Sequence, residues 1–108
     1  AWDAQALHTL VGDNPAAQER LLQIFLKSAT HSVADMATAL EAADFRALAA
    51  LGHKLKSAAR SVGGLHLGAC CEALERAGHA GQAAQCQDLV GRVQQALAAV
   101  QERILAQA

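Results

Sequence analysis

Apolar residues recur along this chain every three or four positions, which is the spacing of one face of an α-helix. One such stripe contains Leu22, Phe25, Ala29, Val33, Met36, Leu40 and Ala43. A second stripe, near the C-terminus, contains Cys86, Leu89, Val90, Val93, Leu97, Val100 and Ile104. The pattern therefore predicts long amphipathic helices, each with one buried face.

Glycine, proline and capping residues divide the pattern into five helices. Gly12 ends the first, and Asp13 or Asn14 can cap the second, which has Pro15 in its first turn. Asp44 can cap the third, and the pair Gly63 and Gly64 can form the left-handed turn that ends it. The predicted helices cover about residues 3–11, 15–43, 44–63, 65–77 and 82–106, with a turn at 78–81.

Short connections between long helices place consecutive helices antiparallel. We therefore predict an all-α fold, an antiparallel up-down four-helix bundle with a short N-terminal cap helix. The 108 residues suffice for one domain with a single core, but not for a nucleotide-binding lobe beside a bundle. Scarce aromatic residues and a single proline, Pro15, agree with an all-helical chain.

Charge and hydropathy exclude several classes of protein. The net charge of −1 gives no general electrostatic footprint for nucleic acid or an anionic membrane. No apolar run is long enough to span a bilayer, and no signal-peptide pattern opens the chain. The chain starts at Ala1 without a methionine, so we expect residues 1–108 to be one domain cut from a longer protein. We expect the domain to be cytoplasmic, in a parent that can be anchored in the inner membrane.

Three cysteines raise the question of a disulfide or a metal site. Their odd number, with Cys70 and Cys71 adjacent, does not suit a secreted disulfide framework. Cys-x-x-Cys spacing, which a structural zinc site would need, is absent. We expect Cys70, Cys71 and Cys86 to be small buried residues in a reducing compartment.

His53 has the clearest chemical setting in the chain. On a helical wheel, Leu48, Leu51, Leu55, Ala59 and Val62 share one face, and His53, Lys56, Ser57 and Arg60 share the opposite face. We therefore expect the imidazole to point away from the core. Its helical neighbours Ala49, Ala50 and Ser57 are short, so a large partner could approach it.

Lys56 and Arg60, three and seven residues after His53, place positive charge beside the imidazole. Near neutral pH an imidazole is largely neutral, and a ring nitrogen has a lone pair that can attack phosphorus. The chain has no Gly-rich phosphate loop, no recognisable nucleophile–base signature and no metal-ligand motif. We therefore predict a covalent phosphoryl carrier, with no cofactor of its own, rather than an enzyme that acts alone.

The segment around His53 resembles the histidine-phosphotransfer (HPt) domain family. The family pattern is His-x-Leu-Lys-Gly/Ser-x-x-x-x-x-Gly, matched here by His53, Leu55, Lys56, Ser57 and Gly63. The resemblance extends to residues 10–13 and 22–25, Asp44 and residues 71–75, and so covers nearly the whole chain. Many members have glycine where this chain has Ser57, but serine is also small and frequent there.

This resemblance implies a phosphorelay intermediate, similar to the C-terminal HPt module of a hybrid sensor histidine kinase. His53 would accept a phosphoryl group from an aspartyl phosphate of a receiver domain and pass it to the receiver of a response regulator. The implied partners are the receiver domains of the parent kinase and of the regulator, with no nucleic acid and no direct membrane contact. The magnesium ion and most catalytic groups would belong to the receiver.

Two open points concern the surroundings of His53. Lys56 and Arg60 either support the transferring phosphoryl group electrostatically or are ordinary surface cations. Leu21 and Ile24 lie off the buried stripe of their helix and must be covered. The cover is either the first helix, through Leu7, Leu10 or Trp2, or a docked receiver.

We expect Ala49, Ala50, Lys54 and Ser57, with Leu21 and Ile24, to contact the partner. The remaining histidines, His8, His31, His66 and His79, lack the combination of flanking cations and family context that His53 has, so we expect them to be structural or solvated. The alternative function is an HPt-shaped bundle that only binds receivers or mediates dimerisation. Retention of both His53 and Lys56 favours the carrier, because a bundle without phosphoryl chemistry could lose the histidine at no cost to its fold.

Overall fold

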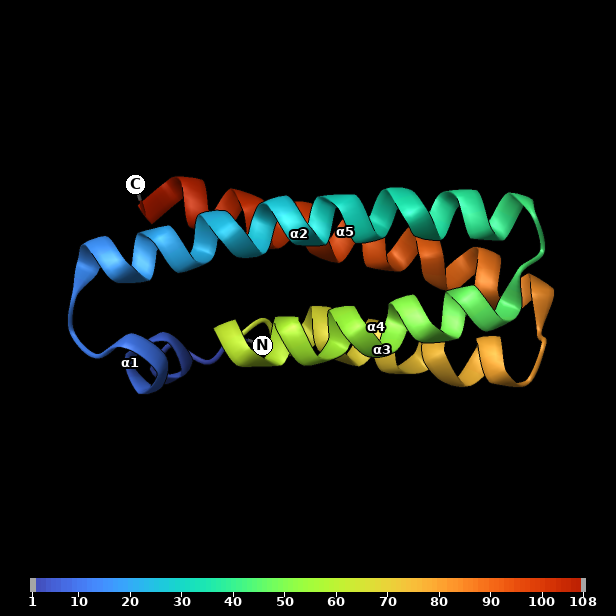
Figure 1. Cartoon of the computed structure of the whole chain (residues 1–108), viewed down its shortest axis with the longest axis horizontal. Coiled ribbons are helices and arrows are strands. Elements are labelled where there is room, and N and C mark those ends of the chain that lie inside the picture. Colours follow the sequence, from blue (N-terminus) through green and yellow to red (C-terminus); the bar gives the residue numbers. More distant parts are fainter. Residues whose placement is uncertain (1, 108) are drawn as a thin grey trace.

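The computed structural model describes residues 2–107, with the side chain of Gln107 left out, and contains five α-helices (Figure 1). They are α1 (Gln5–Val11), α2 (Pro15–Glu41), α3 (Phe45–Val62), α4 (Leu65–His79) and α5 (Ala83–Gln107). The four long helices form an elongated bundle of 42 × 19 × 18 Å, in which α2 and α5 lie on one side and α3 and α4 on the other. The predicted all-α bundle with a short first helix is confirmed.

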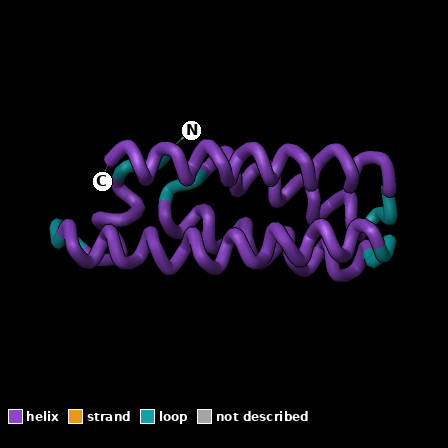
Figure 2. Tube along the Cα trace, turned by 90° about the horizontal axis from the view of Figure 1, so that it is seen from above, coloured by secondary structure: helices purple, strands orange, loops and turns teal. Residues whose placement is uncertain are grey.

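Local signals explain where the helices begin and end. The side chain of Asn14 accepts a hydrogen bond from the amide of Ala17 at 3.1 Å, and that of Asp44 accepts one from Ala47 at 3.0 Å, so both residues cap their helices. Gly63, with φ of 95°, adopts the left-handed conformation that ends α3. Figure 2 shows the loops gathered at the ends of the helices, which run unbroken between them.

The N-terminal segment fastens α1 to the bundle. The amide of Asp3 donates a hydrogen bond of 2.8 Å to the carbonyl of Gly63. Trp2 pairs with Gly64, and the guanidinium of Arg103 lies 5.0 Å from the centre of its ring. Helices α2 and α5 extend beyond the end of α3, and α1 lies below the first half of α2 (Figure 1). Leu7 of α1 packs against the core there.

The core is formed by the predicted apolar faces. Its largest fully buried side chains are Met36, Leu48, Leu55, Leu67, Leu74, Val93, Cys71 and Cys86. All three cysteines are free, and Cys70 is only half-buried, so the prediction that all three are buried is wrong for that residue. Burial raises the pKa of Cys71 to about 12, which keeps its thiol protonated and unreactive at neutral pH.

Two predicted helix ends, those of α2 and α4, differ from the structure. Helix α2 ends at Glu41, and Ala43 lies in the following turn, exposed, with φ of 52°. Helix α4 continues through Gly78 to His79, because Gly78 serves as a contact and not as a turn. A Cβ atom on Gly78 would lie 2.9 Å from both the amide nitrogen of Ala49 and the carbonyl oxygen of Phe45.

Helices α3 and α4 therefore approach each other closely at two glycines. At Gly52, a Cβ atom would lie 2.9 Å from the carbonyl oxygen of Cys71 and 3.1 Å from the amide nitrogen of Glu75. No substitution at Gly52 or Gly78 can avoid these backbone atoms unless the helices move apart. Since Gly52 precedes His53, this contact fixes the position of the histidine relative to α4.

Candidate functional site

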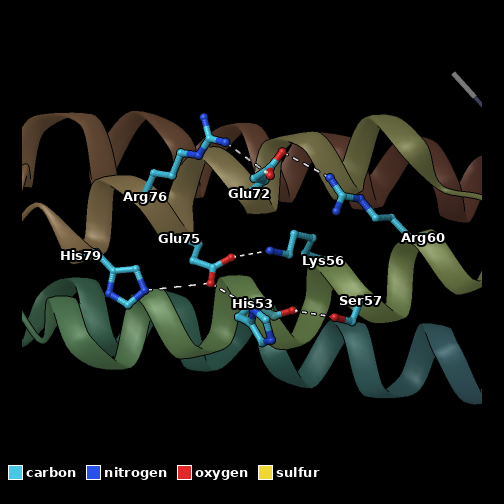
Figure 3. Close-up of polar contacts among 8 residues, drawn as sticks. All are labelled: His53, Lys56, Ser57, Arg60, Glu72, Glu75, Arg76 and His79. Carbon is cyan, nitrogen blue, oxygen red and sulfur yellow. Dashed lines mark hydrogen bonds and ion pairs between the residues drawn. The ribbon is translucent and has the colours of Figure 1, made fainter.

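His53 lies in the middle of α3, and its side chain is 63 % exposed, as the helical pattern predicts. Its Nδ1 atom lies 3.0 Å from Oε2 of Glu75 on α4 (Figure 3). The close packing of Gly52 against the backbone of α4 brings this carboxylate within reach. The imidazole is thus held on one side and open to solvent on the other.

Glu75 connects His53 to Lys56. Its second oxygen, Oε1, accepts a hydrogen bond from Nζ of Lys56 at 2.7 Å. Both side chains of this ion pair are largely buried, with 18 % of Glu75 and 16 % of Lys56 exposed. Lys56 is therefore connected to the histidine through the carboxylate that both residues contact.

The charge of Glu75 determines the tautomer of His53. The hydrogen bond from Lys56 lowers the pKa of Glu75 below its usual value, against the opposing effect of desolvation, and the hydrogen bond with His53 also lowers it. Glu75 is therefore ionised at neutral pH and can only accept hydrogen bonds. The proton of the neutral imidazole must lie on Nδ1, which leaves the lone pair on Nε2 free.

Arg60 belongs to a separate cluster on the same side of the site. Its Nη2 atom lies 3.2 Å from Oε2 of Glu72, whose other oxygen lies 3.6 Å from Nη2 of Arg76. The aliphatic part of Arg60 covers Gly68, where a Cβ atom would lie 3.1 Å from Cγ of the arginine. Of the two predicted supporting cations, the structure thus brings Lys56 to the partner of His53 and Arg60 to a different carboxylate.

Two of the three short residues around His53 are exposed. Ala50 and Ser57 are exposed, and the hydroxyl of Ser57 donates a hydrogen bond of 3.3 Å to the carbonyl of His53. Ala49 is only 1 % exposed, because it packs against Gly78 of α4, so its prediction as a partner contact is wrong. A helix between two neighbours buries a wider face than the single apolar stripe indicates.

Ile24 is not covered by the first helix. It is 60 % exposed and lines a hollow with Lys27, Ser28, His31 and Lys54, whereas Leu21 is half-buried against the core. The three residues predicted as candidates to cover Ile24 either pack at another place or are themselves exposed to solvent. Leu7 lines a hollow with Leu22 and Ile104, Trp2 packs at Gly64, and Leu10 is 52 % exposed.

Glu75 is a side chain beside His53 that the helical pattern does not reveal. It lies within the segment 71–75 that resembles the family, yet nothing in its spacing predicts a pair with residues 19 and 22 positions earlier. His79, one turn further along α4, is 70 % exposed, and its Nε2 atom lies 4.0 Å from Oε2 of Glu75. The remaining histidines, His8, His31 and His66, are exposed, and the carboxylates nearest to His8 and His31 are Asp13 and Asp35.

Within residues 2–107, no group of three or more His, Cys, Asp or Glu side chains could hold a metal ion. None of the helices over the same residues is long and apolar enough to cross a membrane.

An exposed helical histidine whose tautomer is fixed by a carboxylate agrees with the resemblance to the HPt family. Comparison with known proteins shows directly to which family the chain belongs. The family described as "Hpt domain" matches residues 20–103. The chain belongs to the Hpt domain family. Hpt domains are histidine phosphotransfer domains of phosphorelays, and they interact with receiver domains.

A solved structure agrees with this fold. The histidine-containing phosphotransfer protein B (HptB) of Pseudomonas aeruginosa PAO1 is similar to this Hpt domain with a TM-score of 0.91. The match covers 98 % of this chain and 92 % of HptB, at 22 % sequence identity. At that identity the likeness shows a shared fold. No curated protein matches the sequence.

Proposed function

We propose that His53 accepts a phosphoryl group from the aspartyl phosphate of one receiver domain and passes it to the receiver of a response regulator. The observation that supports this most is the hydrogen bond between Nδ1 and Glu75, because it leaves Nε2 unprotonated on an exposed ring. Membership of the Hpt domain family supports the same residue, which is the histidine of the family pattern.

The proposed transfer needs no proton to move. As the Nε2–P bond forms, the bond between phosphorus and the aspartyl oxygen breaks, and the electron pair leaves with the receiver's carboxylate. The ring then keeps its proton on Nδ1 and carries a positive charge, which the carboxylate of Glu75 stabilises. The reverse sequence returns the phosphoryl group to an aspartate. The magnesium ion that neutralises the phosphoryl oxygens belongs to the receiver in this proposal.

We further propose that residues 1–108 form one module of a longer sensor kinase, whose own receiver is the first donor. A direct test of the carrier function is incubation of the domain with a phosphorylated receiver. Label that is stable in base and lost in acid, as phosphohistidine is, supports the proposal. Binding of the receiver without any label would instead support the alternative of an HPt-shaped docking module.

Removal of the charge of Glu75 should slow the chemical step. In Glu75→Gln the amide oxygen can still accept the Nδ1 proton, but the charge that stabilises the phosphorylated ring is lost. We expect a roughly ten-fold lower single-turnover rate at saturating receiver, because the exposed side of the His53 ring lets solvent screen part of the charge that develops there. Asp88→Asn is the matched control, since it removes a carboxylate that pairs with Arg92 on α5, in the groove toward α4 and away from His53. Equal rates for both variants would show that Glu75 has no such role.

Neutralisation of the nearby cations should also reduce the rate. For Lys56→Ala and Arg60→Ala we expect a loss of roughly three- to thirty-fold, or about 0.7 to 2 kcal/mol in the activation barrier. The larger loss should follow Lys56→Ala, because Lys56 binds Glu75 and Arg60 binds Glu72. The test is single-turnover transfer across receiver concentrations. A change seen only below saturation would assign both cations to docking.

Added bulk beside the imidazole should block the approach of the receiver. Ala50 and Ser57 are exposed one turn before and one turn after His53, so leucine at either position hardly disturbs the core. We expect Ala50→Leu and Ser57→Leu to slow transfer strongly, with melting temperatures close to that of the wild type. If both variants transfer at the normal rate, the receiver approaches from another side.

A further inference from the structure

The lysines and arginines on the two sides of His53 differ in whether a carboxylate pairs with them. Four of the nine lysines and arginines bind carboxylates, and these are Lys56, Arg60, Arg76 and Arg92. Arg103 lies over Trp2. The other four cations form no ion pair within the described residues 2–107, and these are Arg20, Lys27, Arg46 and Lys54. All four lie on α2 and α3, whereas each cation of α4 and α5 has a partner within residues 2–107, either a carboxylate or, for Arg103, the ring of Trp2.

One of the unpaired cations, Arg46, lies on the same face of α3 as His53. On α3, Arg46, Ala50, His53 and Ser57 are spaced by four, three and four residues, which places them on one face of the helix. On α2 the same spacing relates Arg20, Ile24, Lys27 and His31. The α2 stripe meets α3 at a hollow that Lys27 and His31 line together with Lys54. We call the surface formed by Arg20, Lys27, Arg46 and Lys54 the basic face.

An exposed apolar residue lies within this basic face. Ile24 is 60 % exposed and lines two hollows, one with Lys27 and Lys54 and the other with Arg20. The carboxylate that continues the α2 stripe is Asp35, one turn beyond His31 and 3.7 Å from it. Ile24 therefore has cations on both sides along the helix and no carboxylate between them.

We propose that this domain is selective for receiver domains whose docking face has an apolar patch, which takes Ile24, surrounded by carboxylates that meet Arg20, Lys27, Arg46 and Lys54. The proposal rests on the proposed function, because the partner must reach His53. Charge complementarity of this kind raises the association rate and excludes partners of the wrong sign. A second copy of the chain would present the same basic face in a two-fold contact, so like charges would oppose one another.

The test uses the radiolabelled, phosphorylated receiver domain that labels the wild-type protein fastest. Transfer is followed below saturation, as kcat/KM, at salt concentrations from about 50 to 500 mM. The first variant, Lys27→Gln/Lys54→Gln, removes two charges from the basic face. The matched control, Arg92→Gln/Gln95→Glu, changes the net charge by the same amount on α5. Both side chains of the control line a groove between α4 and α5, away from His53.

We expect the first variant to lose roughly ten-fold in kcat/KM at low salt and the control less than about two-fold. The wild-type value should fall as salt rises, and that of the Lys27→Gln/Lys54→Gln variant should fall less steeply. Ile24→Ala should lower kcat/KM by a factor that does not depend on salt.

Equal losses in the two double variants, or a wild-type value independent of salt, would overturn the charge proposal. A wild-type dimer that Ile24→Lys dissociates in sedimentation experiments would also overturn it, because the face would then bind a second copy. By contrast, a wild-type protein that takes no label from any receiver would contradict the proposed function itself. The two failures are therefore distinguishable.

Discussion

We expect His53→Gln to abolish phosphoryl uptake from a phosphorylated receiver and to leave the bundle folded. The amide of glutamine is not a nucleophile, so no covalent intermediate can form at this position. The side chain of His53 is largely exposed and contributes little to the core, so the stability should change by less than about 0.5 kcal/mol. Radiolabel uptake measures the first effect, and circular dichroism during thermal unfolding measures the second.

His66→Gln is the matched control for this experiment, since His66 is also exposed but lies on α4, in the groove toward α5. It should take up label as the wild type does. If His53→Gln still became labelled, another histidine would be the acceptor. His79, the imidazole nearest to Glu75 after His53, would then be the first to replace.

We expect Gly78→Ala to destabilise the bundle. The new methyl group would lie 2.9 Å from two backbone atoms of α3, so the two helices must separate. Overpacking of this kind costs about 1 to 3 kcal/mol of unfolding free energy. The matched control is Gly91→Ala on α5, where nothing lies within 4 Å of the added atom. There the better helix propensity of alanine should stabilise the protein by roughly 0.5 to 1 kcal/mol.

Urea denaturation of the two variants gives both values. The opposite signs are the informative result, because the substitution is the same and only the surroundings differ. A Gly78→Ala variant as stable as Gly91→Ala would mean that α3 and α4 are not in close backbone contact. In that case the position of Glu75 beside His53 would need another explanation.

Much of the fold follows from local signals in the sequence. The capping side chains of Asn14 and Asp44 and the left-handed Gly63 divide the chain where the structure does. These features depend on residues within one helical turn, so a single sequence contains them. Gly78 shows the limit of this reasoning. A glycine at a turn and a glycine at a helix–helix contact look alike until the neighbouring helix is known.

The candidate site was predictable only in part. Exposure of His53 follows from helical periodicity, because the apolar stripe fixes which way the ring points. The role of Glu75 does not, since its contacts with His53 and Lys56 depend on the rotation of α4 against α3. Burial of Ala49 escaped prediction for the same reason. Side chains at a helix–helix contact are thus the part of the site that needs the structure.

The position of the phosphoryl group on the protein tests the central claim most directly. After transfer from a phosphorylated receiver, a domain labelled with nitrogen-15 in its histidines can be studied by nuclear magnetic resonance, which distinguishes the two ring nitrogens. We predict that phosphorus is bound to Nε2 of His53 and that Nδ1 keeps its proton, facing Glu75. Phosphorus on Nδ1 of His53, or on any other histidine, would contradict this account.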